Sequence, residues 1–233
     1  MDQQPVAIVT GAGRGIGRAT SIQLAQAGFR LALLARTKTD LAETARRAGE
    51  EKCFVLPADV ANSSLVDAAV AQTVQRFGRL DAVVNCAGQA PMFFLQDMTD
   101  QMWRDVLDIN LSAAFYLCRA AWPVFKRQKS GAVVLVSSVA ARDPFPGFAA
   151  YGAAKAAINS LGWSLSREGA DIGVRVHVVA PGATETAMLR DLFSPQQIPT
   201  DKTLAPEDVA RVIVSCVRGD LVHSSGEVIY LHK

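Results

Sequence analysis

Short apolar runs alternate with helical patterns along the whole chain, and this alternation constrains the fold more than any other feature. The apolar runs lie at residues 6–10, 30–35, 53–56, 81–84, 132–137, 174–179 and 227–231. Runs of this kind are typical of strands that are buried on both faces of a parallel sheet. Right-handed helical crossovers between such strands produce a doubly wound sheet. We therefore predict an α/β fold built on a doubly wound parallel sheet.

Helical patterns fill the segments between these runs. They lie near residues 16–27, 38–49, 63–77, 99–127, 150–170 and 206–217, and Gly28 and Gly78 follow two of them where a left-handed cap ends a helix. No linker rich in Pro, Gly or Ser, no internal repeat and no low-complexity tract interrupts the order. Residues 193–204 lack a periodic pattern and precede the last helix, which suits a loop over a cleft. We predict that residues 1–233 form a single domain.

Composition and charge exclude several classes of partner. The 233 residues include 24 basic and 22 acidic side chains, so the net charge of +2 gives no reason to expect nucleic acid or an anionic membrane. The polar N-terminus is unlike a signal peptide, and no apolar run approaches the ~18 residues that span a bilayer. The four cysteines match neither a metal nor a redox spacing. We expect a cytoplasmic protein without a metal site.

A glycine-rich turn, Thr-Gly-Ala-Gly-Arg-Gly-Ile-Gly at residues 10–17, separates the first expected strand from the first helix. A helix N-terminus carries free N–H groups and about half a positive charge, so it attracts a pyrophosphate. Glycine is needed because a Cβ would hold the backbone away from the phosphates. At the first strand–helix turn of a doubly wound sheet, this pattern predicts a dinucleotide site of the Rossmann type.

The spacing of Gly11, Gly15 and Gly17 resembles that of the short-chain dehydrogenase/reductase family, and further motifs agree in order over nearly the whole chain. They are Asp59-Val60, Asn85-Cys86-Ala87-Gly88, Asn110, Ser137-Ser138, and Pro181-Gly182 with Thr186. The resemblance implies a nicotinamide cofactor bound by Gly11, Arg14, Gly15, Ile16, Gly17, Arg36, Asp59, Val60, Asn85, Ala87, Gly88, Tyr151, Lys155, Pro181, Gly182, Thr184 and Thr186.

The end of the second strand distinguishes NAD from NADP. A carboxylate there binds the 2′-hydroxyl of NAD and repels the 2′-phosphate of NADP. This strand instead ends in Ala35-Arg36, and a guanidinium matches the geometry of a phosphate. Arg14, in the glycine turn, can reach the same phosphate from the other side. The alternative is that both arginines are solvated loop residues. We predict NADP as the cofactor.

Tyr151 and Lys155 are four residues apart, so they share one face of an expected helix. Carbonyl reduction needs a proton donor at the oxygen, and a nearby ammonium lowers the pKa of a tyrosine toward neutrality. By the family resemblance, Lys155 also holds the nicotinamide ribose, Ser138 hydrogen-bonds the substrate oxygen, and Asn110 anchors the lysine through water. Ser137 is the alternative to Ser138, and the spacing to Tyr151 selects Ser138. Asn110 as a locally bonded helix residue is the alternative to its catalytic role.

Ligands of doubly wound sheets bind beyond the carboxyl ends of the strands. The side chains expected to line an apolar substrate pocket there are Pro91, Met92, Phe93 and Phe94, residues 140–148, and Met188, Leu189, Leu192 and Phe193. For the aromatic ones, core or interface packing is the alternative. Arg142 is either a contact for an anionic substrate tail or a solvated side chain. His177, in the middle of a strand, is expected to be structural.

The overall resemblance is to the 3-oxoacyl-thioester reductases of the family. It implies reversible, NADPH-dependent reduction of a ketone or aldehyde to an alcohol, with Tyr151 as the proton donor. The alternative function is an NADP-binding, redox-sensing protein without turnover. Lys126, Arg127 and Lys129 form a basic cluster that either attracts an acidic carrier protein or is a solvated helix end. Family members assemble through helices, so the resemblance also implies a homo-oligomer, a tetramer or a dimer.

Overall fold

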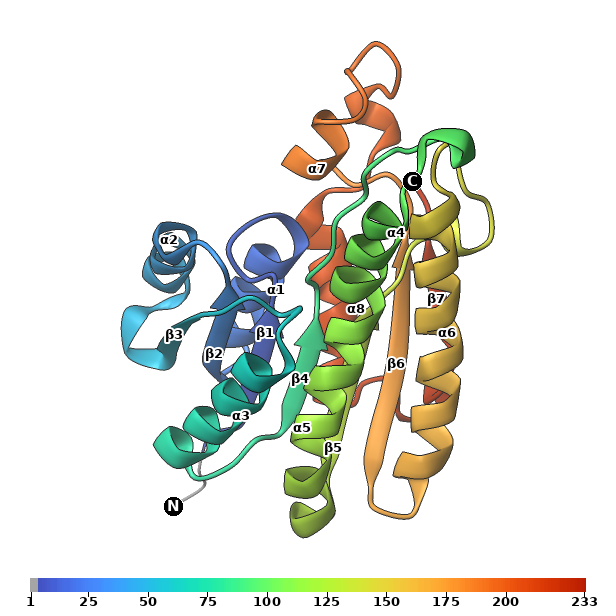
Figure 1. Ribbon diagram of the computed structural model, residues 1–233. Coiled ribbons are helices and arrows are strands. Elements are labelled where there is room, and N and C mark those ends of the chain that lie inside the picture. The colour runs from blue at the N-terminus through green and yellow to red at the C-terminus, as the bar shows by residue number, and fades with distance from the viewer. Residues whose placement is uncertain (1–3) are drawn as a thin grey trace.

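The computed structural model describes residues 4–233 and contains a seven-stranded parallel sheet between two layers of helices (Figure 1). The strands are β1 (Val6–Thr10), β2 (Arg30–Ala35), β3 (Cys53–Pro57), β4 (Ala82–Asn85), β5 (Gly131–Val136), β6 (Val174–Pro181) and β7 (Val228–Leu231). The helices are α1 (Gly15–Gln26), α2 (Lys38–Ala48), α3 (Ser63–Phe77), α4 (Asp100–Leu107), α5 (Ala113–Gln128), α6 (Ala149–Ala170), α7 (Ala187–Arg190) and α8 (Pro206–Arg218). This doubly wound Rossmann-type fold confirms the prediction from the apolar runs.

Alternate residues of each strand pack against opposite helical layers. Val6 and Ile8 belong to the core formed with α3, α5 and α6, whereas Ala7 and Val9 belong to the core formed with α1, α2 and α8. Both faces of the sheet are therefore removed from water. This burial explains why the strands are continuous apolar runs rather than alternating patterns.

The strand order reverses at β1. The sheet runs β3-β2-β1-β4-β5-β6-β7, so β1 pairs with β2 on one side and with β4 on the other. The chain winds away from this point in both directions, and a crevice opens beyond the carboxyl ends of the strands. The loops that follow β1, β2, β4, β5 and β6 meet at this end of the sheet, which is the upper part of Figure 1.

The long helix expected near residues 99–127 is divided into α4, a π-helical turn at Asp108–Ser112, and α5. The side chain of Asn110 accounts for the irregular turn, because its Nδ2 donates to the carbonyl oxygen of Val106 at 3.0 Å. A regular α-helix would offer that carbonyl to the backbone N–H of Asn110 itself. π-turns of this kind frequently occur at functional sites.

The basic cluster Lys126, Arg127 and Lys129 lies at the opposite edge of the sheet from the crevice. α5 runs antiparallel to the strands, so its last turn is near the amino ends of β5 and β6, and the Lys129 carbonyl adjoins Gly173 just before β6. A carrier protein attracted by this cluster would dock far from the crevice.

The other helix and strand boundaries expected from the sequence differ from those in the structure by one or two residues; β6, for example, continues to Pro181.

Candidate active site

A cavity of about 300 Å³ lies at the carboxyl ends of β1 and β2, beside the N-terminus of α1. Its lining comes from the loops after β1, β2, β3, β4 and β6, which meet because parallel strands all end at one edge of the sheet. The lining includes these expected cofactor residues: Gly11, Arg14, Gly15, Ile16, Gly17, Arg36, Asp59, Val60, Ala87, Gly88 and Thr186.

Close packing determines the backbone of the glycine turn. A Cβ on Gly17 would collide with the carbonyl oxygen of Gly11, and a Cβ on Gly11 would lie 2.8 Å from the Ala87 nitrogen. Gly11 also has a φ of +63°, which side chains of L-residues disfavour. α1 begins without a side-chain cap and without an acidic residue in its first turn. Its N-terminal N–H groups and dipole are therefore suited to an anion such as a pyrophosphate.

Arg18 and Thr44 hold the glycine turn against α2. Arg18 Nε donates to Thr44 Oγ1 at 3.0 Å, and Arg18 Nη2 donates to the Gly13 carbonyl oxygen. Thr44, which is fully buried, donates to the carbonyl oxygen of Ala12 at 2.9 Å. These bonds keep the turn after β1 in a constant position relative to the helix after β2.

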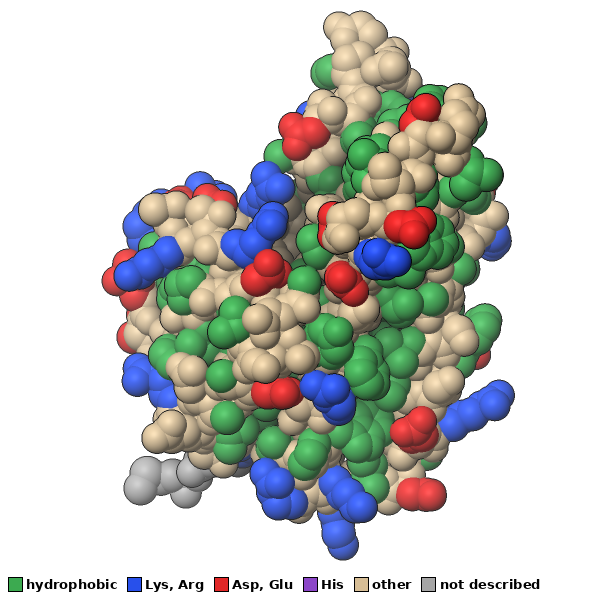
Figure 2. Space-filling view, viewed as in Figure 1, with side chains coloured by type: hydrophobic (Ala, Val, Ile, Leu, Met, Phe, Trp, Pro, Cys, Tyr) green, Lys and Arg blue, Asp and Glu red, His purple; other side chains and the backbone are tan. Residues whose placement is uncertain are grey.

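The rim of the first cavity carries charges of both signs. Arg14 and Arg36 line it with exposed side chains, and neither forms an ion pair with a side chain of residues 4–233. Asp59 lines it as expected, and Asp40 lines it unexpectedly. Asp40 lies in the first turn of α2, directly after the β2 loop, and that position was the available sequence signal. Figure 2 shows basic side chains beside the hollow in this region.

A second cavity of about 460 Å³ continues from the first toward β5 and β6. The two share six lining residues, which are Ile16, Cys86, Gly88, Gln89, Thr186 and Met188. The structure brings together in the second cavity the four expected catalytic residues, Asn110, Ser138, Tyr151 and Lys155, with Pro181, Gly182 and Thr184. A single molecule can therefore extend from the glycine turn to the tyrosine.

Lys155 is a buried lysine, with only 3% of its side chain exposed. Its Nζ donates to the carbonyl oxygen of Val136 at 2.9 Å, which directs the ammonium to the end of β5. Burial disfavours the charged form and lowers the pKa of Lys155 from 10.5 to about 8. The Nζ lies 5.7 Å from the centre of the Tyr151 ring, so a largely protonated ammonium lies beside the phenol at pH 7.

The pKa of the Tyr151 phenol is raised by the protein's own groups. Burial of the phenol raises the pKa, and the hydrogen bond with Ser138 opposes this effect only in part. The shift is therefore opposite to the lowering that we expected from Lys155, because desolvation is its largest cause. The Ser138 hydroxyl also accepts a hydrogen bond from the Ala140 N–H at 3.1 Å. Ser137 instead donates to the Lys155 carbonyl oxygen at 3.0 Å, so of the two serines it is Ser138 that is directed to the tyrosine.

Asn110 connects the π-turn to the loop after β4. Besides its bond to Val106, its Nδ2 donates to the Gln89 carbonyl oxygen at 2.8 Å, and its Oδ1 accepts from the Gln89 N–H at 3.3 Å. These described bonds of the amide go to Gln89 and Val106 rather than to Lys155. Gly88 allows the close approach, since a Cβ there would lie 2.8 Å from Asn110 Oδ1 and 3.5 Å from Lys155 Nζ.

Asn85, an expected cofactor contact, is not among the residues that line either cavity. Its side chain is fully buried, and its Oδ1 accepts a hydrogen bond from Thr10 Oγ1 at 2.9 Å. Thr10 Oγ1 in turn accepts from the Ala87 N–H at 3.2 Å. The structure thus places Asn85 below the cavity floor, where it joins the ends of β1 and β4. His177 is also in the core, with Nε2 at 3.0 Å from the Leu221 carbonyl oxygen.

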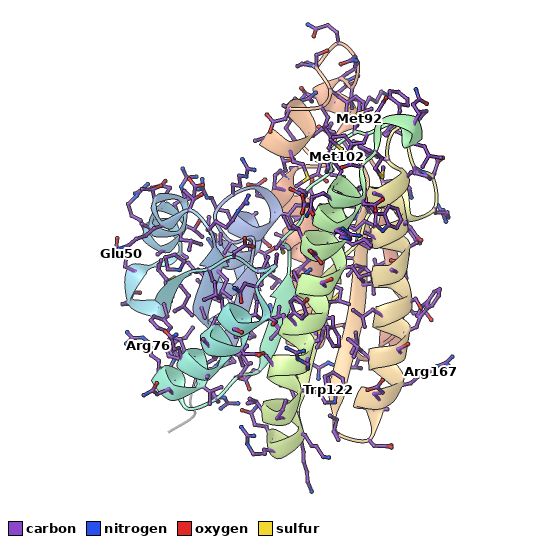
Figure 3. The ribbon with its side chains drawn as sticks, viewed as in Figure 1. Glu50, Arg76, Met92, Met102, Trp122 and Arg167 are labelled. Atoms are coloured by element: carbon purple, nitrogen blue, oxygen red, sulfur yellow. The ribbon has the colours of Figure 1, made fainter. Side chains whose placement is uncertain are left out.

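The expected substrate side chains divide into two groups. Ala140, Asp143, Phe145, Phe148, Met188, Leu189, Leu192 and Phe193 line the second cavity. The segment from Pro91 to Phe94 does not, because it packs outside the loop that precedes α6: the Phe93 N–H donates to the Gly147 carbonyl oxygen at 2.9 Å. Met92 approaches Gly147 at the upper end of the molecule in Figure 3.

Arg142 is also placed differently from the expectation of a contact near the pocket. Its guanidinium lies 4.4 Å from the centre of the Tyr230 ring and is not part of the cavity lining. The cavity instead includes Lys202, His232 and Lys233, which sequence reasoning missed. These residues follow a loop and the last strand, so only the folded chain brings them to the cavity.

The loop over the cleft is present, as the aperiodic segment at residues 193–204 predicts. Its base is closed by two backbone hydrogen bonds of 2.8 Å, from Glu185 N–H to the Leu204 carbonyl and from Leu204 N–H to the Ala183 carbonyl. Arg190 Nε donates to Glu185 at 2.7 Å and holds the pKa of that carboxyl below its ordinary value. This segment, with α7, forms the projection at the top of Figure 1.

An aromatic series connects the loop to the tyrosine. Ring centres lie 5.4 Å apart for Phe193 and Phe145, 6.0 Å for Phe145 and Phe148, and 5.2 Å for Phe148 and Tyr151.

Across residues 4–233, no cluster of His, Cys, Asp and Glu is arranged to hold a metal ion. No helix in the same range is long and apolar enough to cross a membrane.

Known proteins resemble the chain over almost all of its length. The short chain dehydrogenase family model matches residues 5–197. Short-chain reductase protein NovJ of Streptomyces niveus is 35% identical over 246 residues, which cover 99% of this chain and 94% of NovJ. A 3-ketoacyl-(acyl-carrier-protein) reductase from Brucella melitensis, complexed with NADH, has a TM-score of 0.92 at 24% identity and covers 98% of this chain and 96% of its own.

A second solved structure, ElxO with NADP bound, has a TM-score of 0.90 at 24% identity, with 97% of this chain and 96% of that chain covered. The two solved structures share the fold and carry different nicotinamide cofactors. The match to the family model and the sequence identity to NovJ show the family as well as the fold. On these grounds, the chain belongs to the short-chain dehydrogenase/reductase family of oxidoreductases.

Proposed function

We propose that this protein uses NADP(H) to reduce a ketone or aldehyde to an alcohol, reversibly. The observation that carries the proposal is the continuity of the two cavities. Ser138, Tyr151 and Lys155 line the second cavity, which shares six residues with the cavity at the glycine turn. A dinucleotide bound at the glycine turn can therefore reach Ser138, Tyr151 and Lys155, which we assign to proton transfer.

The glycine turn and the reacting residues fit a nicotinamide cofactor, which supplies or accepts the hydride when bound. Ser138 orients the substrate by donating a hydrogen bond to its carbonyl oxygen. Tyr151 donates the proton to that oxygen, and its raised pKa keeps it protonated at pH 7, which is the state that reduction requires. Lys155 is mostly charged at pH 7, since its pKa is about 8, and it stabilises the phenolate that remains.

NADP is supported over NAD by the two exposed arginines at the rim, Arg14 and Arg36. Asp40 lines the same cavity and weakens the positive potential of the two arginines. The preference for NADP over NAD therefore depends on how close each side chain comes to the 2′-phosphate. We expect Arg36→Ala to weaken NADP binding by about 10- to 100-fold, the range for a lost charge-assisted hydrogen bond, and to leave NAD binding nearly unchanged.

Titration calorimetry with both cofactors measures this preference. Arg211→Ala, which removes an exposed arginine on α8, is the matched control and should bind both cofactors as the wild type does. Equal or tighter binding of NAD by the wild type would contradict the proposal.

The catalytic proposal is tested by Tyr151→Phe, which removes only the hydroxyl. NADPH consumption with a panel of ketones and aldehydes should fall by at least about 100-fold, the usual contribution of general acid catalysis. NADPH binding should change little. Normal rates in this variant would refute the mechanism. A wild-type protein that binds NADPH and consumes none with any carbonyl compound would favour the redox-sensing alternative.

We also propose a cytoplasmic homo-oligomer, a dimer or a tetramer. Trp103 of α4, Phe115 of α5 and Trp163 of α6 are 40%, 45% and 52% exposed, and Figure 2 shows apolar side chains gathered over α5 and α6. Exposed apolar patches of this kind mark interaction surfaces. Sedimentation that showed only 24.9 kDa monomers would contradict the oligomer.

A further inference from the structure

The outer end of the second cavity carries positive charge that the proposed reaction does not use. Lys202, His232 and Lys233 line it, and Asp143 is the carboxylate among the described lining residues. Lys202 and Lys233 are exposed, and neither forms an ion pair with a side chain of residues 4–233. Lys202 therefore contributes a positive charge without a described ion-pair partner to the lining of this cavity.

Much of the lining of the second cavity is apolar. Phe145, Phe148, Leu189, Leu192 and Phe193 line it. Their side chains favour a substrate body made of carbon and hydrogen, because each buried apolar area stabilises the complex. The Lys202 ammonium, by contrast, has no anionic side chain as a described partner on the protein.

Lys202 is held in place by the closed base of the loop. It ends a 3₁₀ turn at Thr200–Lys202, and the next residue, Thr203, is 3% exposed and donates to Glu185 Oε2 at 3.0 Å. Leu204 is then tied to the end of β6 by the two backbone bonds described above. The backbone of Lys202 is therefore fixed relative to the catalytic strand ends.

The nearby carboxylate of Glu185 does not neutralise Lys202. Both of its oxygens accept hydrogen bonds from the Arg190 guanidinium, and one also accepts from Thr203. Arg142 cannot replace Lys202, since its guanidinium is stacked on Tyr230. Lys202 thus has a fixed backbone and an exposed side chain without a described ion-pair partner, so its charge is available to a ligand.

We propose, on the basis of the proposed function, that the substrate has an apolar body and an anionic group, and that Lys202 binds this group at the mouth of the second cavity. A carboxylate and a phosphate share the required chemistry. Lys202 acts as a specificity-determining residue: it contributes to binding of the substrate and takes no part in the proton or hydride transfer.

The test compares keto carboxylates of increasing chain length with their methyl esters and with the corresponding keto phosphates. For the chain length that fits, the wild type should show a kcat/KM about 3- to 10-fold higher for the anion than for the ester, as expected for a partly exposed charge pair. Lys202→Gln should remove this preference through KM, with kcat and NADPH affinity unchanged. Lys126→Gln, at the far end of α5, is the matched control and should retain it. The better of the two anions identifies the natural group.

Equal kcat/KM for acids and esters in the wild type would overturn the inference, and so would a preference that persists in Lys202→Gln. The inference and the proposed function fail in different ways. Calorimetry with a long-chain carboxylic acid that has no ketone or aldehyde group measures the anion site without turnover. Binding that depends on Lys202, in a protein that reduces no carbonyl compound, would refute the function and support the site.

Discussion

Replacing Lys155 by methionine should make the protein more stable at neutral pH while it removes activity. Lys155 is 3% exposed, and desolvation lowers its pKa from 10.5 to about 8. Between these two pH values the unfolded chain binds a proton that the folded chain releases, so the buried charge costs stability below about pH 8. The lowering corresponds to about 3 kcal/mol.

Part of this gain is lost again in the variant. Methionine has a similar length and no donor, so the Val136 carbonyl oxygen, which accepts from Nζ at 2.9 Å, loses its partner. An unsatisfied buried carbonyl costs about 1 kcal/mol. We therefore expect a net gain of about 2 kcal/mol at pH 7, which corresponds to about 4–8 °C in Tm for a chain of this size.

Urea denaturation of both proteins at pH 7 and pH 9.5 checks the reasoning. As the pH rises from 8 toward 10.5, the wild-type protein loses its penalty, so the stability advantage of the Lys155→Met variant should largely disappear at pH 9.5. Burial also raises the thiol pKa of Cys86 and Cys118 to about 12, which lowers stability as the pH rises above 9. For Cys118 that effect is common to both proteins and cancels in their difference. The Cys86 thiol also interacts with Lys155, but in both proteins the folded chain keeps this thiol protonated at pH 9.5, so its contribution nearly cancels as well. A less stable variant at pH 7, or a difference that is the same at both pH values, would refute the argument.

Two further substitutions test the positioning of the site. Gly88→Ala places a Cβ 2.8 Å from Asn110 Oδ1 and beside Lys155 Nζ, so kcat should fall about 10-fold or more with the circular dichroism spectrum unchanged; an unchanged kcat would show that the site tolerates the shift. Arg190→Ala removes the ion pair to Glu185 that restrains the loop, so limited proteolysis should cut residues 187–204 faster and the substrate KM should rise a few-fold, while NADPH affinity stays the same. Loop cleavage at the wild-type rate would contradict a restraining role for Arg190.

The five inner strands could be predicted from the sequence because both faces of the sheet are buried there, which leaves continuous apolar runs. The edge strands β3 and β7 are only half-buried, yet they too are apolar runs. The glycine turn was predictable for a local reason, since Gly11 and Gly17 approach each other within one turn. The four expected catalytic residues line one cavity, although only Ser138 lies just after a strand; Asn110 lies in the π-turn, and Tyr151 and Lys155 lie in the first two turns of α6. The assignment of their roles came from family resemblance and stays a prediction until it is measured.

Other features depend on packing between distant segments, which periodicity does not report. The π-turn arises because Asn110 bonds Val106 and Gln89 at once. Arg142 lies away from the cavity because its guanidinium packs on Tyr230, which belongs to the edge strand β7. Sequence spacing gave no indication of either contact.

The distribution of charge connects the two ends of the continuous cavity. A net charge of +2 over the whole chain is too small to attract polyanions. The structure nevertheless places cations without described ion pairs at both ends, Arg14 and Arg36 at the first cavity and Lys202 at the second, with an apolar section between them. The two ends are separate sites, so their contributions should be additive, as they are for residues without shared partners. Arg36→Ala combined with Lys202→Gln should therefore weaken NADP binding as Arg36→Ala does and abolish the anion preference as Lys202→Gln does. A double variant whose cofactor affinity differs from that of Arg36→Ala would show that Lys202 also acts on the cofactor, and the assignment of Lys202 to the substrate would be wrong.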